Sequence, residues 1–187
     1  MTSSTPQPQA DAPLRYYAQD SSVDKRAPTK AIAAALHLAY THWVRANCHR
    51  RDFRCAAEHV ADMLMVNYFM AAQVPAGLPE YLALLPQTPR TPVELASLAR
   101  TRPAEPPKRF YDELCAIAPE VSLDALEAVL PPLFKQWCLE GWVARDFVCA
   151  VRDAAAVVIY DHEIAQSLAG LGGGRTESEF LTQPYTG

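Results

Sequence analysis

One stretch of this chain occurs twice in nearly the same form, and it constrains the fold more than any other feature. Residues 50–64 read RRDFRCAAEHVADML, and residues 144–158 read ARDFVCAVRDAAAVV. When residues 31–68 are aligned with residues 125–162, a shift of 94 positions, ten of the 38 pairs are identical. Both segments contain the pattern W-x7-R-D-F-x-C-A without a gap. The sequence therefore predicts two copies of one structural unit.

The apolar residues of both copies recur at three- and four-residue steps, which is typical of α-helices. In the first copy, one such face comprises Ile32, Ala35, Leu36, Ala39, Tyr40 and Trp43. The helix expected from residue 53 onward is apolar nearly all round in its second half, which predicts deep burial. No segment shows the period of two expected of a strand. Each copy is therefore predicted to be an αα-hairpin.

A proline-rich segment separates the two copies, with nine of the 16 prolines between residues 74 and 120. Short helices fit between these prolines. In TPVELASLAR, Thr91 and Glu94 form the signature of a capping box around Pro92. KRFYDELCAIA is expected to form another short helix. Two further prolines, Pro131 and Pro132, are expected to kink or restart the first helix of the second copy.

We therefore expect an all-α helical bundle of two pseudo-repeated αα-hairpins joined by a proline-rich crossover of short helices. The segments before and after it are rich in small and polar residues and predict a flexible leader and tail. An alternative for the leader is a strap, with Leu14, Tyr16 and Tyr17 docked on the body. The expected boundaries are 1–27 for the leader, 28–168 for a single helical domain (repeats at about 29–72 and 121–168, insert at 73–120) and 169–187 for the tail.

The residues that the copies share have the character of packing and capping residues. A tryptophan lies near the end of the first helix, and an aspartate lies where the second begins, so Thr29 and the two aspartates are expected to act as N-caps. The phenylalanine is expected to point back at the first helix, and the cysteine is small enough for close helix contact. These signature residues are Trp43, Asp52, Phe53 and Cys55 in the first copy and Trp137, Asp146, Phe147 and Cys149 in the second.

Few residues have the types and spacing of a catalytic or metal-binding site. Cys48, His49, Cys55 and His59 include zinc-ligand types, but their spacing matches no common zinc motif and is not repeated in the second copy. We identify no catalytic residues, no metal site and no cofactor motif. A polar site formed by Arg51–Asp52 and Arg145–Asp146 across a pseudo-twofold axis is an alternative to the structural interpretation.

The densest cluster of basic residues occurs in only one of the two copies. A net charge of −4 and a pI near 5.7 give the whole chain no general attraction for nucleic acid or for acidic membranes. The cluster is therefore a candidate for a specific contact with a partner protein or with phosphates. Its members are Arg45, His49, Arg50, Arg51 and Arg54.

The remaining composition bears on location. The five cysteines include no C-x-x-C pair, which favours reduced thiols in the cytoplasm. The first residues lack the charged and apolar regions of a secretory signal peptide. The sequence does not show whether they form a secretion signal of another kind. No apolar run approaches the roughly 18 residues of a membrane span.

We predict a non-enzymatic protein-interaction module, such as an adaptor, an immunity-type inhibitor or a regulatory subunit. The alternatives are a nucleic-acid-associated regulator that uses the basic cluster, and a helical enzyme or ligand-binding bundle with a polar seam.

Overall fold

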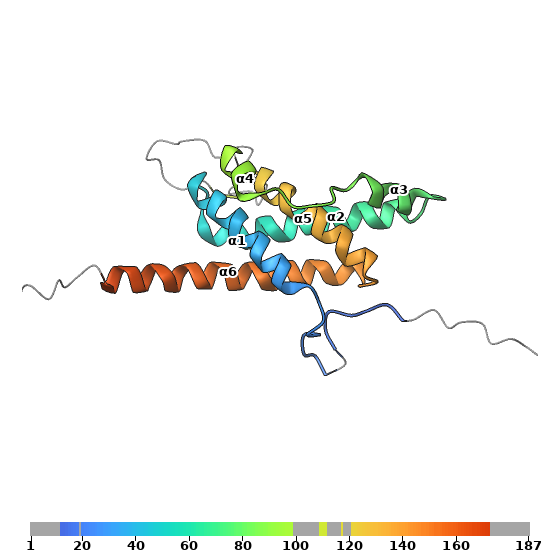
Figure 1. Ribbon diagram of the computed structural model, residues 1–187, viewed down its shortest axis with the longest axis horizontal. Helices are drawn as coiled ribbons and strands as arrows, with labels where there is room; N and C mark the ends of the chain where they lie inside the picture. Colours follow the sequence, from blue (N-terminus) through green and yellow to red (C-terminus); the bar gives the residue numbers. More distant parts are fainter. Residues whose placement is uncertain (1–11, 19, 99–108, 112–116, 118–120, 173–187) are drawn as a thin grey trace, which may run out of the picture.

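The computed structural model describes residues 12–18, 20–98, 109–111, 117 and 121–172. This part of the chain is helical and contains no β-strand (Figure 1). The predicted all-α class is therefore confirmed. The elements are α1 (Thr29–Arg45), a short 3-10 helix (Arg50–Asp52), α2 (Phe53–Ala71), α3 (Gly77–Leu84), α4 (Pro92–Leu98), α5 (Asp124–Leu139) and α6 (Ala144–Gly172).

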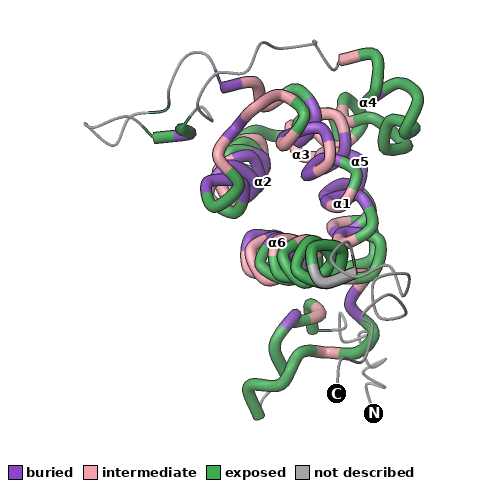
Figure 2. Tube along the Cα trace, turned by 90° about the vertical axis from the view of Figure 1, so that its left-hand side faces the viewer, coloured by how far each residue is buried: buried purple, intermediate pink, exposed green. Residues whose placement is uncertain are grey.

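The longest helices, α2 and α6, lie side by side and run in opposite directions, while α1 and α5 cross them (Figure 1). Helix α1 packs against α6 and α5, and α2 packs against α6 and α5. The helices of each expected hairpin therefore pack mainly on helices of the other pair. Their buried faces turn toward one another (Figure 2). At the joint between α1 and α2, Phe53 contacts Trp43 with ring centroids 5.8 Å apart, and Phe147 contacts Trp137 at 5.6 Å between α5 and α6.

The helix starts differ from the prediction in three of four places. Helix α1 follows Pro28 at its cap position, and Thr29 makes no side-chain cap bond. Asp52 makes no cap bond to α2, and Asp146 lies inside the first turn of α6, which begins at Ala144. Both aspartates bind elsewhere, as described below. The Thr91 capping box is confirmed: Thr91 N–H donates to the Glu94 carboxylate at 2.7 Å, and Glu94 N–H donates to Thr91 Oγ1 at 3.3 Å.

Helix α5 continues through Pro131 and Pro132, so of the two expected outcomes, a kink or a restart, the restart does not occur. A proline inside a helix removes the N–H that would bond to the carbonyl four residues earlier. The carbonyl freed by Pro132 belongs to Ala128, and it accepts the N–H of Arg90, at 3.4 Å, from the segment before α4. The proline-rich crossover therefore supplies, through the Arg90 N–H, a hydrogen-bond donor for a carbonyl that Pro132 leaves without a partner inside α5.

Two expectations about helix surfaces and ends are also wrong. The second half of α2 is not deeply buried: Met63 and Val66 are each 49% exposed, and Met70 is 66% exposed. A helix that is apolar all round could pack on any side, but only one face of α2 packs against other helices. Helix α6 extends through Gly170 to Gly172 instead of ending near Leu168, because glycine weakens a helix without preventing it.

The segment KRFYDELCAIA does not form the expected helix where the structure describes it. Arg109–Tyr111 is extended, and Tyr111 forms an isolated antiparallel bridge with Ile117. Tyr17 forms the same kind of bridge with Val23 near the other end of the chain. These two extended segments bring arginine and aromatic side chains to the helix joints. Residues 169–172 of the predicted tail at 169–187 belong to α6, and the rest of that tail, like residues 1–11, lies outside the described residues.

Candidate functional site

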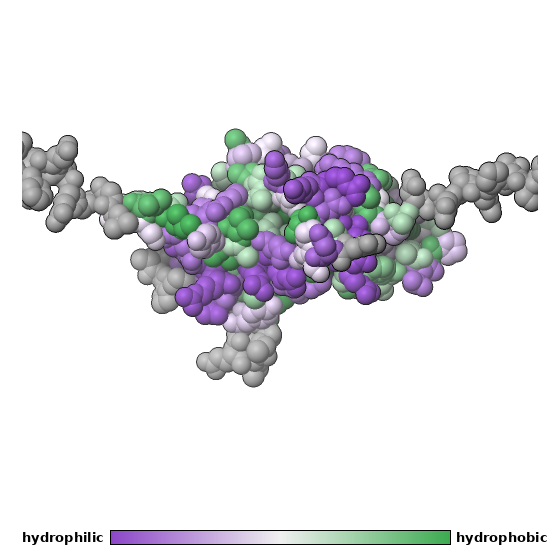
Figure 3. Space-filling model, turned by 90° about the horizontal axis from the view of Figure 1, so that it is seen from below, coloured by the Kyte–Doolittle hydropathy of each residue, from purple (hydrophilic) through white to green (hydrophobic). Residues whose placement is uncertain are grey.

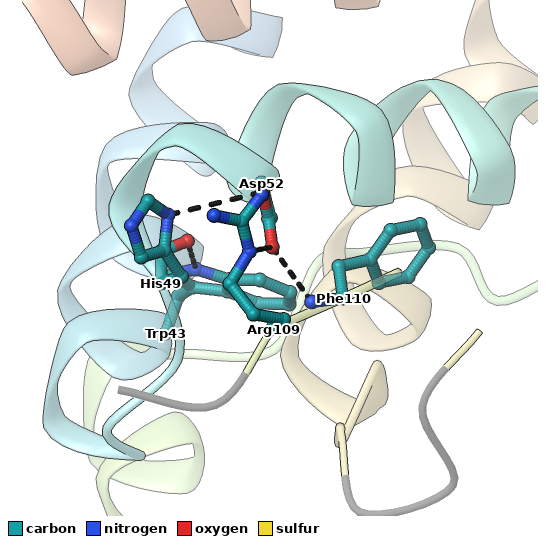
Figure 4. Close-up of polar contacts among 5 residues, drawn as sticks. All are labelled: Trp43, His49, Asp52, Arg109 and Phe110. Atoms are coloured by element: carbon teal, nitrogen blue, oxygen red, sulfur yellow. Dashed lines mark hydrogen bonds and ion pairs between the residues drawn. The ribbon is translucent and has the colours of Figure 1, made fainter. Parts of the chain in front are cut away.

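Asp52 is the centre of a polar site at the joint between α1 and α2 (Figure 4). Its side chain is only 6% exposed, and it accepts two hydrogen bonds from the Arg109 guanidinium, both at 2.9 Å. The backbone N–H of Phe110 donates to Asp52 Oδ2 at 2.7 Å. His49 Nδ1 lies 3.8 Å from Asp52 Oδ1, and Trp43 Nε1 donates to the His49 carbonyl at 2.9 Å. Three donors thus compensate one buried carboxylate, as burial of a charge requires.

Asp146 is the centre of a second site with the same atoms in the same roles. Arg15 Nε and Nη2 donate to Asp146 Oδ2 and Oδ1 at 2.8 and 2.9 Å, and Tyr16 N–H donates to Oδ2 at 2.9 Å. Trp137 Nε1 donates to the Val143 carbonyl at 2.9 Å. Each of these residues stands 94 positions from its counterpart at the Asp52 site. The two sites are therefore equivalent in geometry and in sequence spacing.

Both arginines come from extended segments, which we call the first strap (residues 12–18) and the second strap (residues 109–111). Each strap precedes one helix pair in sequence and docks on the other pair. The first strap also bonds through its main chain, because Leu14 N–H donates to the Gly141 carbonyl at 3.0 Å and Val143 N–H donates to the Leu14 carbonyl at 2.9 Å. Leu14 and Tyr16 thus dock on the helical body, as the alternative prediction of a strap proposed for the leader.

The aromatic residues of the straps meet different partners. The Tyr16 and Tyr17 hydroxyls donate to Asp153 Oδ2 at 3.3 and 2.6 Å. Burial and nearby Asp153 raise the pKa of Tyr16, and the hydrogen bond to Asp153 raises the pKa of Tyr17, so both phenols remain protonated donors at neutral pH. At the other site, Phe110 contacts the ring of His59 with centroids 6.0 Å apart.

Sequence reasoning missed the arginine of each strap and, in the second strap, Phe110; Tyr16 of the first strap was named as a docking residue but not connected with Asp146. A signal was present: the shift of 94 residues also aligns PLRYY at 13–17 with PKRFY at 107–111. The repeat therefore extends further toward the N-terminus than residues 31–68 and 125–162. Because a strap lies far in sequence from the helices that it contacts, the aspartates alone did not reveal it.

The members of the predicted basic cluster have different neighbours. Arg51 and Arg54 line a shallow pocket against Tyr160 and Glu163 of α6, and Arg50 donates to the Gln166 side chain. Arg45 lines a different pocket, between α1 and α4. His49 belongs to the Asp52 site. The structure therefore brings Arg51 and Arg54 together and separates them from Arg45.

The other candidates are also dispersed. In the described part of the chain, no three histidine, cysteine, aspartate or glutamate side chains lie close enough to hold a metal ion, and this includes Cys48, His49, Cys55 and His59. Arg145 lies over the ring of Phe69, 5.6 Å from its centroid, so it turns away from Asp146. None of the described helices has both the length and the apolar character needed to cross a membrane.

A second type of surface consists of exposed apolar residues on one flank of each long helix. On α2 and just after it, Met63, Val66, Met70 and Val74 are 49–66% exposed; on α6, Val157, Tyr160, Ile164 and Leu168 are 40–63% exposed. We call these sets the α2 stripe and the α6 stripe.

Comparisons with models of protein families, with curated proteins and with solved structures give no significant match to this chain.

Proposed function

We propose that the chain is a protein-interaction module made of two copies of one strap–helix–helix unit, which acts as an adaptor, inhibitor or regulatory subunit. The observation that supports this proposal most directly is the pair of apolar stripes. A shift of 94 residues places every member of the α2 stripe on a member of the α6 stripe. Isolated exposed apolar residues are normal on proteins, but here the same four repeat positions carry exposed apolar residues in both copies.

The spacing within each stripe supports a contact surface. On α6, steps of three, four and four residues place the four side chains one above another on a helix flank, and on α2 the same holds for Met63, Val66 and Met70, with Val74 just after the helix. Such a flank offers a continuous apolar strip, which is the usual character of a surface that meets another protein. Apolar atoms at the end of α6 nearest residue 172 are visible at the left of Figure 3. The stripes are therefore suited to the apolar face of a partner helix or groove.

The alternatives have less support. A regulator that binds nucleic acid would use a basic surface, but Glu163 lines the pocket that contains Arg51 and Arg54 and offsets part of their charge. A polar seam would need the two Arg–Asp pairs to meet, whereas Asp52 and Asp146 each bind the arginine of a strap. We therefore propose neither of these functions.

A photo-crosslinking amino acid placed at Met70 or at Ile164 tests the proposal in the native host cell. We expect both positions to crosslink to one or a few defined proteins, at least tenfold above the same probe at Glu127, an exposed position of α5. Met70→Lys and Ile164→Lys, made in chains that carry a probe at Val66 or Tyr160, are expected to abolish the crosslinks. Circular dichroism is expected to show that these variants remain folded. Equal crosslinking at the stripes and at Glu127 would refute the proposal.

A further inference from the structure

The two aspartate sites hold segments that share little besides an arginine followed by two aromatic residues, RYY at 15–17 and RFY at 109–111. We propose that the Asp146 site is a binding pocket for an extended peptide with the sequence Arg–Tyr. In this proposal, the first strap is the built-in occupant, and an Arg–Tyr segment of a partner protein takes its place. This inference does not depend on the apolar stripes.

The chemistry of the pocket identifies the ligand class. Asp146 presents both carboxylate oxygens, and the guanidinium of Arg15 binds them in a bidentate manner that lysine does not reproduce. Oδ2 also accepts the N–H of the next residue, so the arginine must be part of an extended peptide rather than a free amino acid. The Gly141 carbonyl and the Val143 N–H bind the main chain one residue earlier. The pocket therefore recognises a peptide backbone and one arginine side chain together.

The residue after the arginine is selected by a group that differs between the two sites. At the Asp146 site, Asp153 accepts the hydroxyls of Tyr16 and Tyr17. His59 stands 94 residues before Asp153 and contacts Phe110 instead. A peptide with phenylalanine in place of Tyr16 loses the 3.3 Å bond to Asp153 but keeps the 2.6 Å bond of the following tyrosine. The Asp146 pocket thus favours Arg–Tyr over Arg–Phe by one hydroxyl donor.

The first strap has the features of a displaceable occupant. The side chain of Arg15 is 64% exposed although its carboxylate partner is 6% exposed, so a competing guanidinium reaches the pocket from solvent. Beyond the pocket, the segment is tied to itself: Asp24 N–H donates to the Tyr16 carbonyl, and Ala18 N–H donates to the Ser22 carbonyl, both at 2.7 Å. These internal bonds survive when the strap leaves. A peptide that repeats the strap's contacts restores the bonds that the body loses.

A fluorescent peptide with the sequence of residues 12–27 tests the proposal against the full chain. We expect saturable binding, measured by fluorescence anisotropy, to the Arg15→Ala chain, whose own strap is weakened. Binding to the wild-type chain is expected to be at least tenfold weaker, because its own strap competes at a high effective concentration. Adding Asp146→Asn to Arg15→Ala is expected to abolish binding, whereas adding Glu127→Gln, at an exposed position of α5, leaves it unchanged. A control peptide that carries Arg15→Ala is expected not to bind.

The wild-type chain provides a second measurement that needs no variant. Excess unlabelled peptide is expected to increase amide hydrogen exchange at residues 14–17 at least fivefold, because these residues leave the pocket. Absence of binding to the folded Arg15→Ala chain, or equal binding of the control peptide, overturns the proposal, as does unchanged exchange. A concentration-dependent dimer of the wild-type chain that Asp146→Asn abolishes would assign the pocket to the strap of a second copy and overturn the partner-protein assignment.

Discussion

Asp52 and Asp146 each accept hydrogen bonds from the same three donor atoms: Nε and Nη2 of an arginine and the N–H of the residue that follows it. The bonds at the two sites differ in length by no more than 0.2 Å. In each case the arginine belongs to a strap that precedes the opposite helix pair. The aspartates therefore hold two distant parts of the chain together instead of capping the helices that contain them.

Removal of either aspartate is expected to destabilise the protein. Asp52→Ala and Asp146→Ala each remove a buried carboxylate that accepts three hydrogen bonds, but its arginine partner is 59% or 64% exposed, so solvent screens the ion pair. The expected loss is therefore about 1–2 kcal/mol of unfolding free energy. Urea denaturation followed by circular dichroism measures this loss. Arg51→Ala is the matched control, since Arg51 neighbours Asp52 but is exposed, and we expect a change within about 0.5 kcal/mol. Equal effects of Asp52→Ala and Arg51→Ala would show that the Asp52 site contributes nothing to stability.

The two tryptophan bonds are expected to contribute equally. Trp43→Phe and Trp137→Phe each remove one indole donor to a backbone carbonyl and are expected to cost at least about 1 kcal/mol. Because both bonds are 2.9 Å long and join equivalent positions, the two losses should agree closely. Thermal unfolding of each variant provides the comparison. Leu139→Ala, at an exposed position of α5, serves as a control with little expected effect.

Gly141 is expected to tolerate asparagine better than alanine. Its φ angle is +84°, in the left-handed region, and a Cβ atom there would meet nothing within 4 Å. The cost of a substitution is therefore conformational, about 1–2 kcal/mol for Gly141→Ala. Asparagine adopts this conformation more readily, and Asn47 does so at the position 94 residues earlier, with φ of +57°. A Gly141→Asn chain as unstable as Gly141→Ala would contradict this explanation.

The start of α4 is expected to loosen in acid. Hydrogen bonds from Thr91 lower the pKa of Glu94 below its ordinary value of 4.5. A lowered carboxyl pKa stabilises the fold above the ordinary value, and this contribution is lost as the pH falls through the lowered value. Amide exchange at residues 92–95 should therefore accelerate, relative to the intrinsic rate, as the pH falls below the ordinary Glu94 value of 4.5 and through the lowered one. Glu94→Gln should abolish this pH dependence. Thr91→Ala removes only the side-chain bond and leaves the backbone N–H bond, so it should return the pKa of Glu94 only partway toward 4.5; an acceleration that persists in Glu94→Gln would locate its cause elsewhere.

The Cys138 thiol is expected to resist alkylation in the folded protein. Burial raises its pKa from 9.0 to about 12, which lowers the thiolate fraction at pH 8 by about 1000-fold. Iodoacetamide should modify the peptide that contains Cys138 rapidly in denaturing urea and very slowly without it. Mass spectrometry of the digested protein measures both rates. Similar rates in the two conditions would contradict the burial of this thiol.

Local patterns in the sequence predicted the elements but not how they combine. The three- and four-residue periods of α1 and α6 and the Thr91 capping box depend on neighbouring residues, so they were readable directly. The destinations of Asp52 and Asp146 were not, because an aspartate at a helix start has the same local sequence whether it binds its own helix or a distant arginine. The partner pairs are separated by 57 and 131 residues.

Burial was the least readable property. Residues Met63 to Met70 are mostly apolar, and that composition is compatible both with a core helix and with a helix that presents a surface to a partner. The tertiary packing decides between them, because α2 meets α5 and α6 along one side only. The same limit applies to Pro132, whose place inside a helix depends on a donor from Arg90.

The crossing of the straps sets an order of events during synthesis. Arg15 is made early, but its carboxylate partner Asp146 is made 131 residues later. At translation rates of about 5–20 residues per second, this interval is on the order of 10 s. During that time, the first strap has no Asp146 to bind, and the second strap can reach Asp52 first. The Asp52 site can therefore close once residue 111 has left the ribosome, while the Asp146 site closes only once residue 146 has left it.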